Sequence, residues 1–110
     1  MILAIDMGNS NIVVGGIDSS RIYFEERLTT DRNKTNLEYA ISIKNILEIH
    51  GIEVSSIEGT IISSVVPPLN NTLTTAIKKI TGKTPVLVGS GRNTGLNIIL
   101  DTAKTTGSDM

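Results

Sequence analysis

The stretch from Asp6 to Asn11 contains residue types that could hold a phosphate group and a metal ion. A carboxylate at the end of a buried strand is costly unless it binds a cation or accepts a hydrogen bond. Gly8 lets the backbone approach a ligand closely, and Asn9, Ser10 and Asn11 offer short donor side chains beside backbone amides. Asp6 could then hold Mg²⁺, which usually takes one or two carboxylates together with phosphates and waters. The alternative is a β-hairpin whose Asp and Asn side chains cap their own turn, and so short a stretch favours this alternative when taken alone.

Three other polar features have simpler interpretations. The segment from Gly89 to Gly95 is rich in glycine but lacks the G-x-G-x-x-G spacing of a dinucleotide fingerprint, so we expect a surface loop. His50 falls near the expected end of a helix, where an imidazolium interacts favourably with the helix dipole, and no catalytic role is expected for it. The stretch from Asp31 to Lys34 is expected to be a solvated connection, with contact to a phosphate or a neighbouring subunit as the alternative.

Composition and charge indicate one small globular domain and exclude several classes of function. Hydrophobic residues make up 39% and charged residues 19% of the 110 positions, as is ordinary for a globular protein. Ten basic and eleven acidic side chains give a net charge of −1, so nothing favours nucleic acid or an anionic membrane. The absence of cysteine excludes disulfides and thiolate metal sites. Neither a signal peptide nor the ~18 apolar residues of a membrane span is visible, so a cytoplasmic location is expected.

Three short apolar runs at the start of the chain predict strands that would place the Asp6 stretch in a turn. These runs cover residues 2–5, 11–17 and 21–28, and turn-forming residues separate them. Connections this short require antiparallel pairing, because a parallel pair needs a crossover of about a dozen residues or more.

A helix is expected next. Thr35 and Glu38 have the spacing of a capping box, and Gly51 can serve as the cap at the other end. Between them, five residues recur on one helical face, which predicts the side that packs on the sheet: Tyr39, Ala40, Ile43, Ile46 and Leu47.

Two further strands and a second helix follow. Residues 59–66 predict a strand, Pro68 suits the first position of a helix that ends at Gly82, and residues 85–88 predict a buried strand. This order predicts an α/β fold, with a mixed sheet of three antiparallel strands followed by strand–helix crossovers. No later element closes a core, so residues 1–110 are expected to be one domain truncated at its C-terminal end, with a second domain absent.

Three stretches together resemble one enzyme family. A first strand that ends in Asp-x-Gly-Asn-Ser-Asn before two antiparallel strands resembles the first phosphate loop of the actin, sugar kinase and Hsp70 superfamily. The run from Ile62 to Leu69 resembles the Ser-Ser-Val-Val-Pro signature of type III pantothenate kinases, and residues 107–109 resemble their Gly-x-Asp-Arg motif. The chain therefore resembles the N-terminal half of such a kinase. This implies an actin-like ATPase (ribonuclease H-like) domain and makes the phosphate loop the favoured interpretation of the Asp6 stretch.

The resemblance also implies site residues and ligands. Asp6 would hold Mg²⁺ beside the ATP phosphates, and Asp109 would be the general base that accepts the proton of the pantothenate hydroxyl group. The residues implied in ATP binding are Asp6, Met7, Gly8, Asn9, Ser10, Asn11, Ile12 and Val13, and those implied in pantothenate binding are Leu100, Gly107, Ser108, Asp109 and Met110. A homodimer and a site for a monovalent cation (K⁺ or NH4⁺) beyond residue 110 are implied as well.

Two positions depart from the family pattern. Met110 stands where an arginine is usual, and Leu100 stands where relatives often have an aromatic residue. The expected function is ATP-dependent phosphorylation of pantothenate to 4'-phosphopantothenate, the first step of coenzyme A biosynthesis, with the 110-residue chain inactive alone. Two alternatives stay open: a non-catalytic actin-like nucleotide-binding or regulatory protein, such as a transcription accessory factor, and another small-molecule kinase of the superfamily.

Overall fold

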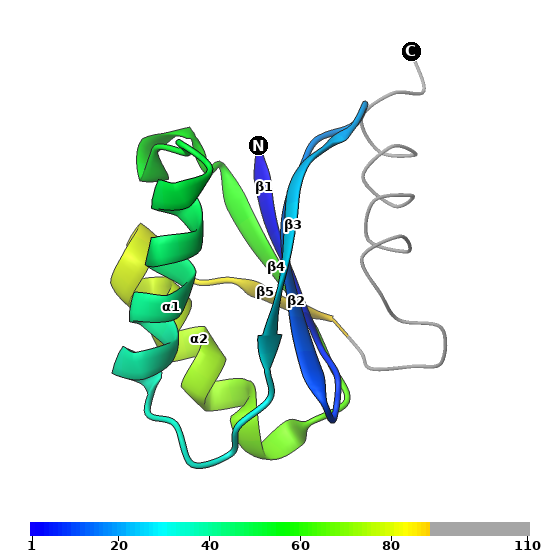
Figure 1. Ribbon diagram of the computed structural model, residues 1–110, viewed down its shortest axis with the longest axis vertical. Helices are drawn as coiled ribbons and strands as arrows, with labels where there is room; N and C mark the ends of the chain where they lie inside the picture. Colours follow the sequence, from blue (N-terminus) through cyan, green and yellow to red (C-terminus); the bar gives the residue numbers. More distant parts are fainter. Residues whose placement is uncertain (89–110) are drawn as a thin grey trace.

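Residues 1–88, the part of the chain that this computed structural model describes, form a mixed five-stranded sheet with two helices on one face (Figure 1). The strands lie in the order β3-β2-β1-β4-β5, so β1 is central. The strands are β1 (Ile2–Met7), β2 (Asn11–Ile17), β3 (Ile22–Thr29), β4 (Gly59–Ser64) and β5 (Val86–Val88). The helices are α1 (Asn36–Ile49) and α2 (Asn70–Thr81), with short 3-10 turns η1 (Val54–Ser56) and η2 (Pro67–Leu69).

The pairing of the strands follows the lengths of their connections. β1 pairs antiparallel with β2, and β2 with β3, as their short connections predict. β4 pairs parallel with β1 after a crossover through α1, and β5 pairs parallel with β4 after a crossover through α2. The predicted mixed sheet is therefore confirmed.

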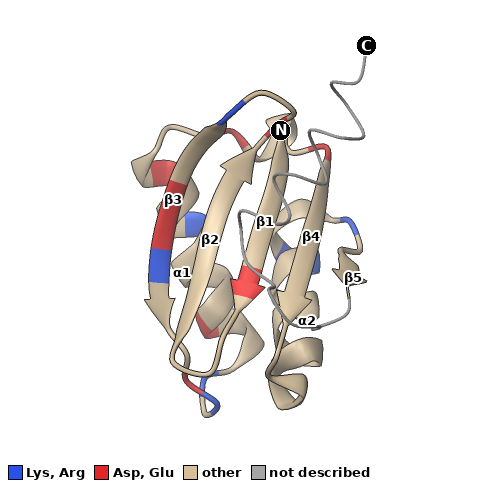
Figure 2. Ribbon diagram, turned by 90° about the vertical axis from the view of Figure 1, so that its right-hand side faces the viewer, with Lys and Arg blue, Asp and Glu red and all other residues tan. Residues whose placement is uncertain are grey.

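Alternation along β1 separates two faces of the sheet. Leu3, Ile5 and Met7 are fully buried in the main core, which also contains the apolar faces of α1 and α2. Ala4 and Asp6 belong to the opposite face, where Ala4 is part of a smaller apolar cluster. Figure 2 looks onto this face, with both helices behind the sheet. We call it the open face, because neither helix covers it.

Helix α1 begins where its sequence predicts and ends within one residue of the prediction. The Thr35 side chain accepts a hydrogen bond from the Glu38 N–H group at 3.2 Å, and the Glu38 carboxylate accepts one from Thr35 N at 2.8 Å, so the capping box is formed. His50 is the C-cap, one residue earlier than predicted, and Gly51 follows with a positive φ of 69°. All five residues of the predicted face are buried. Within residues 1–88, no helix has the length and apolarity that crossing a bilayer requires.

The second half of the sheet departs from the expectations in three respects. β4 ends at Ser64, two residues early. Pro67 and Pro68 form the turn η2, and α2 itself begins at Asn70. Residues 86–88 form a strand as predicted, but the prediction that this strand is buried was wrong. Among the described residues, Val86, Leu87 and Val88 are 60%, 48% and 38% exposed. Within residues 1–88, β5 is the last strand at that edge of the sheet, and no further described strand screens its side chains.

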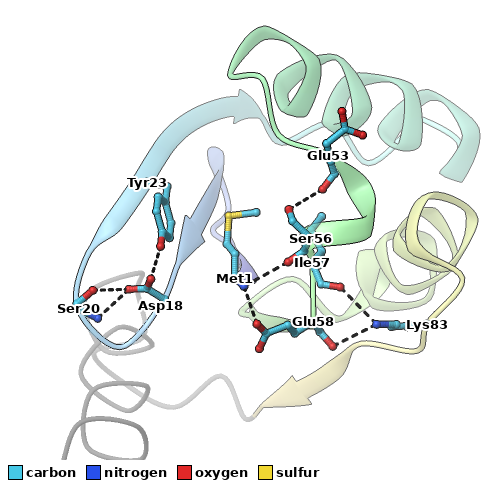
Figure 3. A network of polar contacts seen from close by, with 9 residues as sticks. All are labelled: Met1, Asp18, Ser20, Tyr23, Glu53, Ser56, Ile57, Glu58 and Lys83. Carbon is cyan, nitrogen blue, oxygen red and sulfur yellow. Dashed lines mark hydrogen bonds and ion pairs between the residues drawn. The ribbon is translucent and has the colours of Figure 1, made fainter.

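The turn between β2 and β3 shows how an aspartate caps its own hairpin (Figure 3). Asp18 Oδ1 accepts hydrogen bonds from Ser20 N at 2.8 Å and Arg21 N at 3.0 Å, and Asp18 Oδ2 accepts one from the Tyr23 hydroxyl group. The hydrogen bond from Tyr23 contributes most to holding the pKa of Asp18 well below its usual range. Both oxygens of this carboxylate therefore accept hydrogen bonds from residues of the same hairpin.

Candidate phosphate-binding site

The turn between β1 and β2 is held by the backbone and by the end of β3. Gly8 N donates to Asn11 O at 2.9 Å and closes the turn. Thr30, which directly follows β3, holds the turn in place, because its Oγ1 donates to Gly8 O at 2.7 Å and its N–H group donates to Ser10 O at 3.0 Å. A side chain at Gly8 would bring a Cβ within 3.1 Å of Asn11 O, a contact so tight that the backbone of the turn would have to shift slightly. The turn thus has no side chain at Gly8, and Thr30 holds its backbone at both Gly8 and Ser10.

Within the described part of the chain, the side chains of this turn do not bond to the turn itself, in contrast to Asp18 in its turn. Among residues 1–88, no hydrogen bond joins the side chains of Asp6, Asn9 or Asn11 to the backbone of the turn. Asn9, Ser10 and Asn11 are exposed. The stretch forms a hairpin, which both the phosphate-loop and the simple-turn interpretations required. However, within residues 1–88 its Asp and Asn side chains do not cap the turn. Its polar groups remain available to a ligand.

Asp6 lies one residue before the end of β1, on the open face, between Val13 of β2 and Ser63 of β4. It is half-buried, and burial raises the pKa of its carboxyl group. No donor compensates that desolvation among the described residues. A cation placed at this carboxylate would reverse the effect, because an opposite charge favours the ionised form.

Ser63 is the neighbour that the sequence did not single out as a site residue. It is 1% exposed and pairs in register with Asp6. Its Oγ has no hydrogen-bond partner within the described part of the chain. The sequence signal was the run of polar residues at the end of an apolar strand, but only the register of β4 against β1 reveals which residue faces Asp6.

The structure separates the residues implied in ATP binding into three groups. Asp6, Gly8 and the exposed residues 9–11 present polar groups at the end of the sheet. The side chains of Met7 and Ile12 are fully buried in the main core, so only their backbone groups can reach a ligand. Val13 lies beside Asp6 on the open face, where it packs on the smaller cluster.

The connection from Asp31 to Lys34 follows Thr30 directly and is anchored to α1. The Tyr39 hydroxyl group accepts from Asp31 N at 2.8 Å and donates to Asp31 O at 2.7 Å. Burial is the main reason that the pKa of Tyr39 is raised, which keeps this hydroxyl group protonated. Lys34 Nζ lies 5.5 Å from the centre of the Tyr39 ring. Tyr39 thereby holds the backbone at Asp31, the residue that follows Thr30.

Several predicted residues lie outside the described range of 1–88. These are the glycine-rich segment 89–95 and the five residues implied in pantothenate binding, Leu100, Gly107, Ser108, Asp109 and Met110. His50 is described and has a structural setting. Its ring stacks on Phe24 with centroids 4.9 Å apart, and its Nε2 lies 2.6 Å from a carboxylate oxygen of Glu26.

The donors at the end of β1 suit magnesium better than a transition metal. Within residues 1–88, no group of three or more His, Cys, Asp or Glu side chains could enclose a metal ion. Asp6 offers one desolvated carboxylate, and Ser63 beside it offers an unpaired hydroxyl group. Mg²⁺ is commonly held by one or two carboxylates, with phosphate oxygens and waters completing its shell. The residues present therefore fit this ion when a phosphate ligand accompanies it.

Comparison with known proteins gives a consistent family. A family model described as type III pantothenate kinase matches residues 2–110. The type III pantothenate kinases of Halalkalibacterium halodurans and Brevibacillus brevis are each 41% identical to this chain over 109 residues. These matches cover 99% of this chain and 43% of each relative, so the chain spans less than half the length of the relatives it matches.

Solved structures with low sequence identity share the fold. A Porphyromonas gingivalis protein assigned as an N-acetylglucosamine kinase aligns with a TM-score of 0.61 at 15% identity, over 82% of this chain and 34% of its own. The ROK hexokinase of Thermus thermophilus aligns with a TM-score of 0.56 at 14% identity, over 80% and 33%. The mixed sheet that the order of elements predicted is thus the actin-like ATPase fold that the resemblance implied. With the family match covering almost every residue, the chain belongs to the type III pantothenate kinase family.

Proposed function

We propose that this chain is the N-terminal part of a kinase that transfers the γ-phosphate of ATP to the primary hydroxyl group of pantothenate. The product is 4'-phosphopantothenate, the first intermediate toward coenzyme A. Family membership supports the choice of substrates. The observation that carries the chemistry is the tethered turn at Gly8, with the carboxylate of Asp6 beside it, which accepts no hydrogen bond from residues 1–88.

In this proposal the turn from Gly8 to Ser10 binds the phosphates of ATP. Exposed Asn9 and Ser10 add short side-chain donors next to backbone amides, an arrangement that suits phosphate oxygens. The tether from Thr30 orders the turn before the ligand arrives, so less conformational entropy is lost on binding. The missing side chain at Gly8 lets the backbone lie directly against the ligand.

Asp6 is proposed to hold Mg²⁺, which when bound supplies charge neutralisation for the phosphate oxygens. The carboxylate is held in place by β1, the central strand of the sheet, with β2 and β4 on either side. Partial burial strengthens electrostatic interactions at this position, because less solvent screens them. Asp6 therefore orients the phosphate chain, while the Gly8 turn binds it.

Asp109 is proposed to accept the proton of the pantothenate hydroxyl group as that group attacks the γ-phosphate. Phosphoryl transfer depends mainly on alignment and charge stabilisation, and a carboxylate oriented toward the nucleophile meets the remaining need. Leu100, Gly107, Ser108 and Met110 are proposed to lie along pantothenate. Met110 replaces a usual arginine, so this chain would bind its substrate with one cation fewer.

The remaining parts of the proposal concern what completes the site. Relatives are more than twice as long as this chain, and we propose that a second domain covers the nucleotide from the far side. A homodimer and a monovalent cation, K⁺ or NH4⁺, complete it. In the absence of that second domain, the nucleotide would stay exposed to water and the acceptor would not be held in line.

The test measures ADP release by the full-length protein with and without pantothenate. Pantothenate-dependent release is expected in the wild type, and Asp6→Asn should lower kcat by at least ~10²-fold, since a group that stabilises transition-state charge is removed. Asp18→Asn is the matched control, because it changes a turn aspartate at the other end of β2 and should retain full activity. Release that is independent of pantothenate would indicate another acceptor. The absence of turnover would support a non-catalytic nucleotide-binding protein.

A further inference from the structure

The hydroxyl group of Ser63 is buried but forms no hydrogen bond with the described residues. Ser63 is 1% exposed, and its Oγ has no hydrogen-bond partner within residues 1–88. A buried polar group that is unpaired destabilises the folded state, and such groups in native structures call for an explanation. Two other hydroxyl groups near the site are paired: Ser64 Oγ accepts from Val66 N at 2.9 Å, and Thr30 Oγ1 donates to Gly8 O.

The register of β4 places Ser63 beside Asp6 on the open face. Ile62 of β4 pairs with Ile5 of β1 in the main core, so the next pair along, Ser63 and Asp6, belongs to the opposite face. Both residues lie at the carboxyl ends of adjacent parallel strands, which is where open α/β sheets bind their ligands. The two polar groups therefore share one place, although no hydrogen bond joins them among the described contacts.

A second unpaired hydroxyl group on the same strand provides a comparison. Thr60 is 5% exposed, and its Oγ1 also lacks a partner among the described residues. It pairs with Leu3, on the helix-covered face and at the other end of β4. Thr60 and Ser63 thus share burial and lack of a partner, but only Ser63 lies beside a carboxylate.

We propose that Ser63 is a positioning residue of the phosphate site, whose Oγ accepts a hydrogen bond from a water molecule bound to the Mg²⁺ that Asp6 holds. Mg²⁺ retains several waters in protein sites, and each of these waters is a strong donor that needs an acceptor. Ser63 supplies an acceptor that nothing else in the described chain uses. The inference rests on the proposed function, because it requires magnesium at Asp6.

The test compares Ser63→Ala with Thr60→Val in the full-length protein. Calorimetric titration gives the Kd for ATP with Mg²⁺ and with a chelator, and thermal unfolding gives the Tm without ligand. Ser63→Ala should raise the Kd measured with Mg²⁺ about 10-fold, as expected for one lost hydrogen bond near a charged group, and leave the Kd without Mg²⁺ unchanged. Its Tm should be equal or higher, since an unpaired hydroxyl group is removed. Thr60→Val should likewise keep or raise the Tm but change neither Kd.

The outcomes separate this inference from the function on which it rests. A lower Tm for Ser63→Ala with no magnesium-dependent change would overturn the inference, because the hydroxyl group would then be structural. Equal weakening with and without Mg²⁺ would also overturn it. Asp6→Asn is measured in parallel. If Asp6→Asn abolishes the magnesium dependence and Ser63→Ala does not alter it, only the role of Ser63 fails. If Asp6→Asn keeps the magnesium dependence, the proposed function of Asp6 fails.

Discussion

The hydroxyl group of Thr30 fastens the Gly8 turn to the end of β3, so its removal tests whether the shape of the turn matters for nucleotide binding. Thr30 Oγ1 donates to Gly8 O at 2.7 Å, across 22 residues of sequence. Thr30→Val keeps the shape of the side chain and removes this donor. The backbone hydrogen bond from Thr30 N to Ser10 O remains, so the turn should loosen without unfolding.

The size of the effect follows from one partly buried hydrogen bond. Such a bond contributes about 0.5–1.5 kcal/mol net to stability, and we take ~1 kcal/mol. In a protein of roughly 150–250 residues, this loss lowers the Tm by about 2–4 °C. If the whole of that free energy holds the turn in its binding geometry, the Kd for ATP rises about five-fold.

Differential scanning calorimetry measures the first quantity, and isothermal titration of full-length protein with Mg²⁺ and ATP measures the second. Thr30→Ser retains the hydroxyl group and serves as the control, with a Kd close to that of the wild type. A lower Tm with an unchanged Kd would mean that the tether stabilises the fold without shaping the site. Wild-type values for both quantities in Thr30→Val would refute the reasoning altogether.

Three further predictions concern Asp6, Thr35 and Asp109. Because burial raises the pKa of Asp6, its ionisation costs folding free energy above that pKa, so Asp6→Asn should raise the Tm more at pH 7 than at pH 4. Thermal unfolding across that range checks this, and a gain that grows as the pH falls would contradict it. Thr35→Ala removes the side-chain acceptor of the capping box and should lower the free energy of unfolding by ~1 kcal/mol in urea titrations, whereas Glu38→Gln, which keeps an acceptor, should cost less. Asp109→Asn in the full-length protein should lower kcat by ~10²–10⁴-fold and leave the Kd for ATP nearly unchanged, as expected for a general base. Loss of ATP binding with kcat preserved would instead assign Asp109 a structural role.

Elements that are neighbours in the chain were predictable from the sequence because local signals determine them. Short connections require antiparallel pairing, and this established β1, β2 and β3. Thr35 and Glu38 marked the start of α1, and Gly82, with a φ of 74°, marked the end of α2. Each of these signals acts within a few residues, and no tertiary contact is needed to interpret it.

Features that depend on distant segments were not predictable in the same way. The register between β1 and β4 is set by how α1 packs on the sheet, so the sequence could not place Ser63 beside Asp6. The hydrogen bond from Thr30 to Gly8 likewise joins the residues that directly follow β3 and β1, two strands that each pair with β2 but not with each other. The apolar composition of β5 predicted burial, but burial depends on what lies next to an edge strand.

The contacts that shape the Gly8 turn all lie within residues 8–30, and this has a consequence for the order of folding. Contacts that are close in sequence require little loop-closure entropy and form early, whereas β4 can join β1 only after the crossover through α1 is complete. During synthesis, the turn can thus reach its final shape while β4 has yet to be made. Damage to the packing of α1 or α2 should accordingly release β4 and β5 first, and hydrogen exchange should show protection persisting longest in the β1–β2–β3 meander.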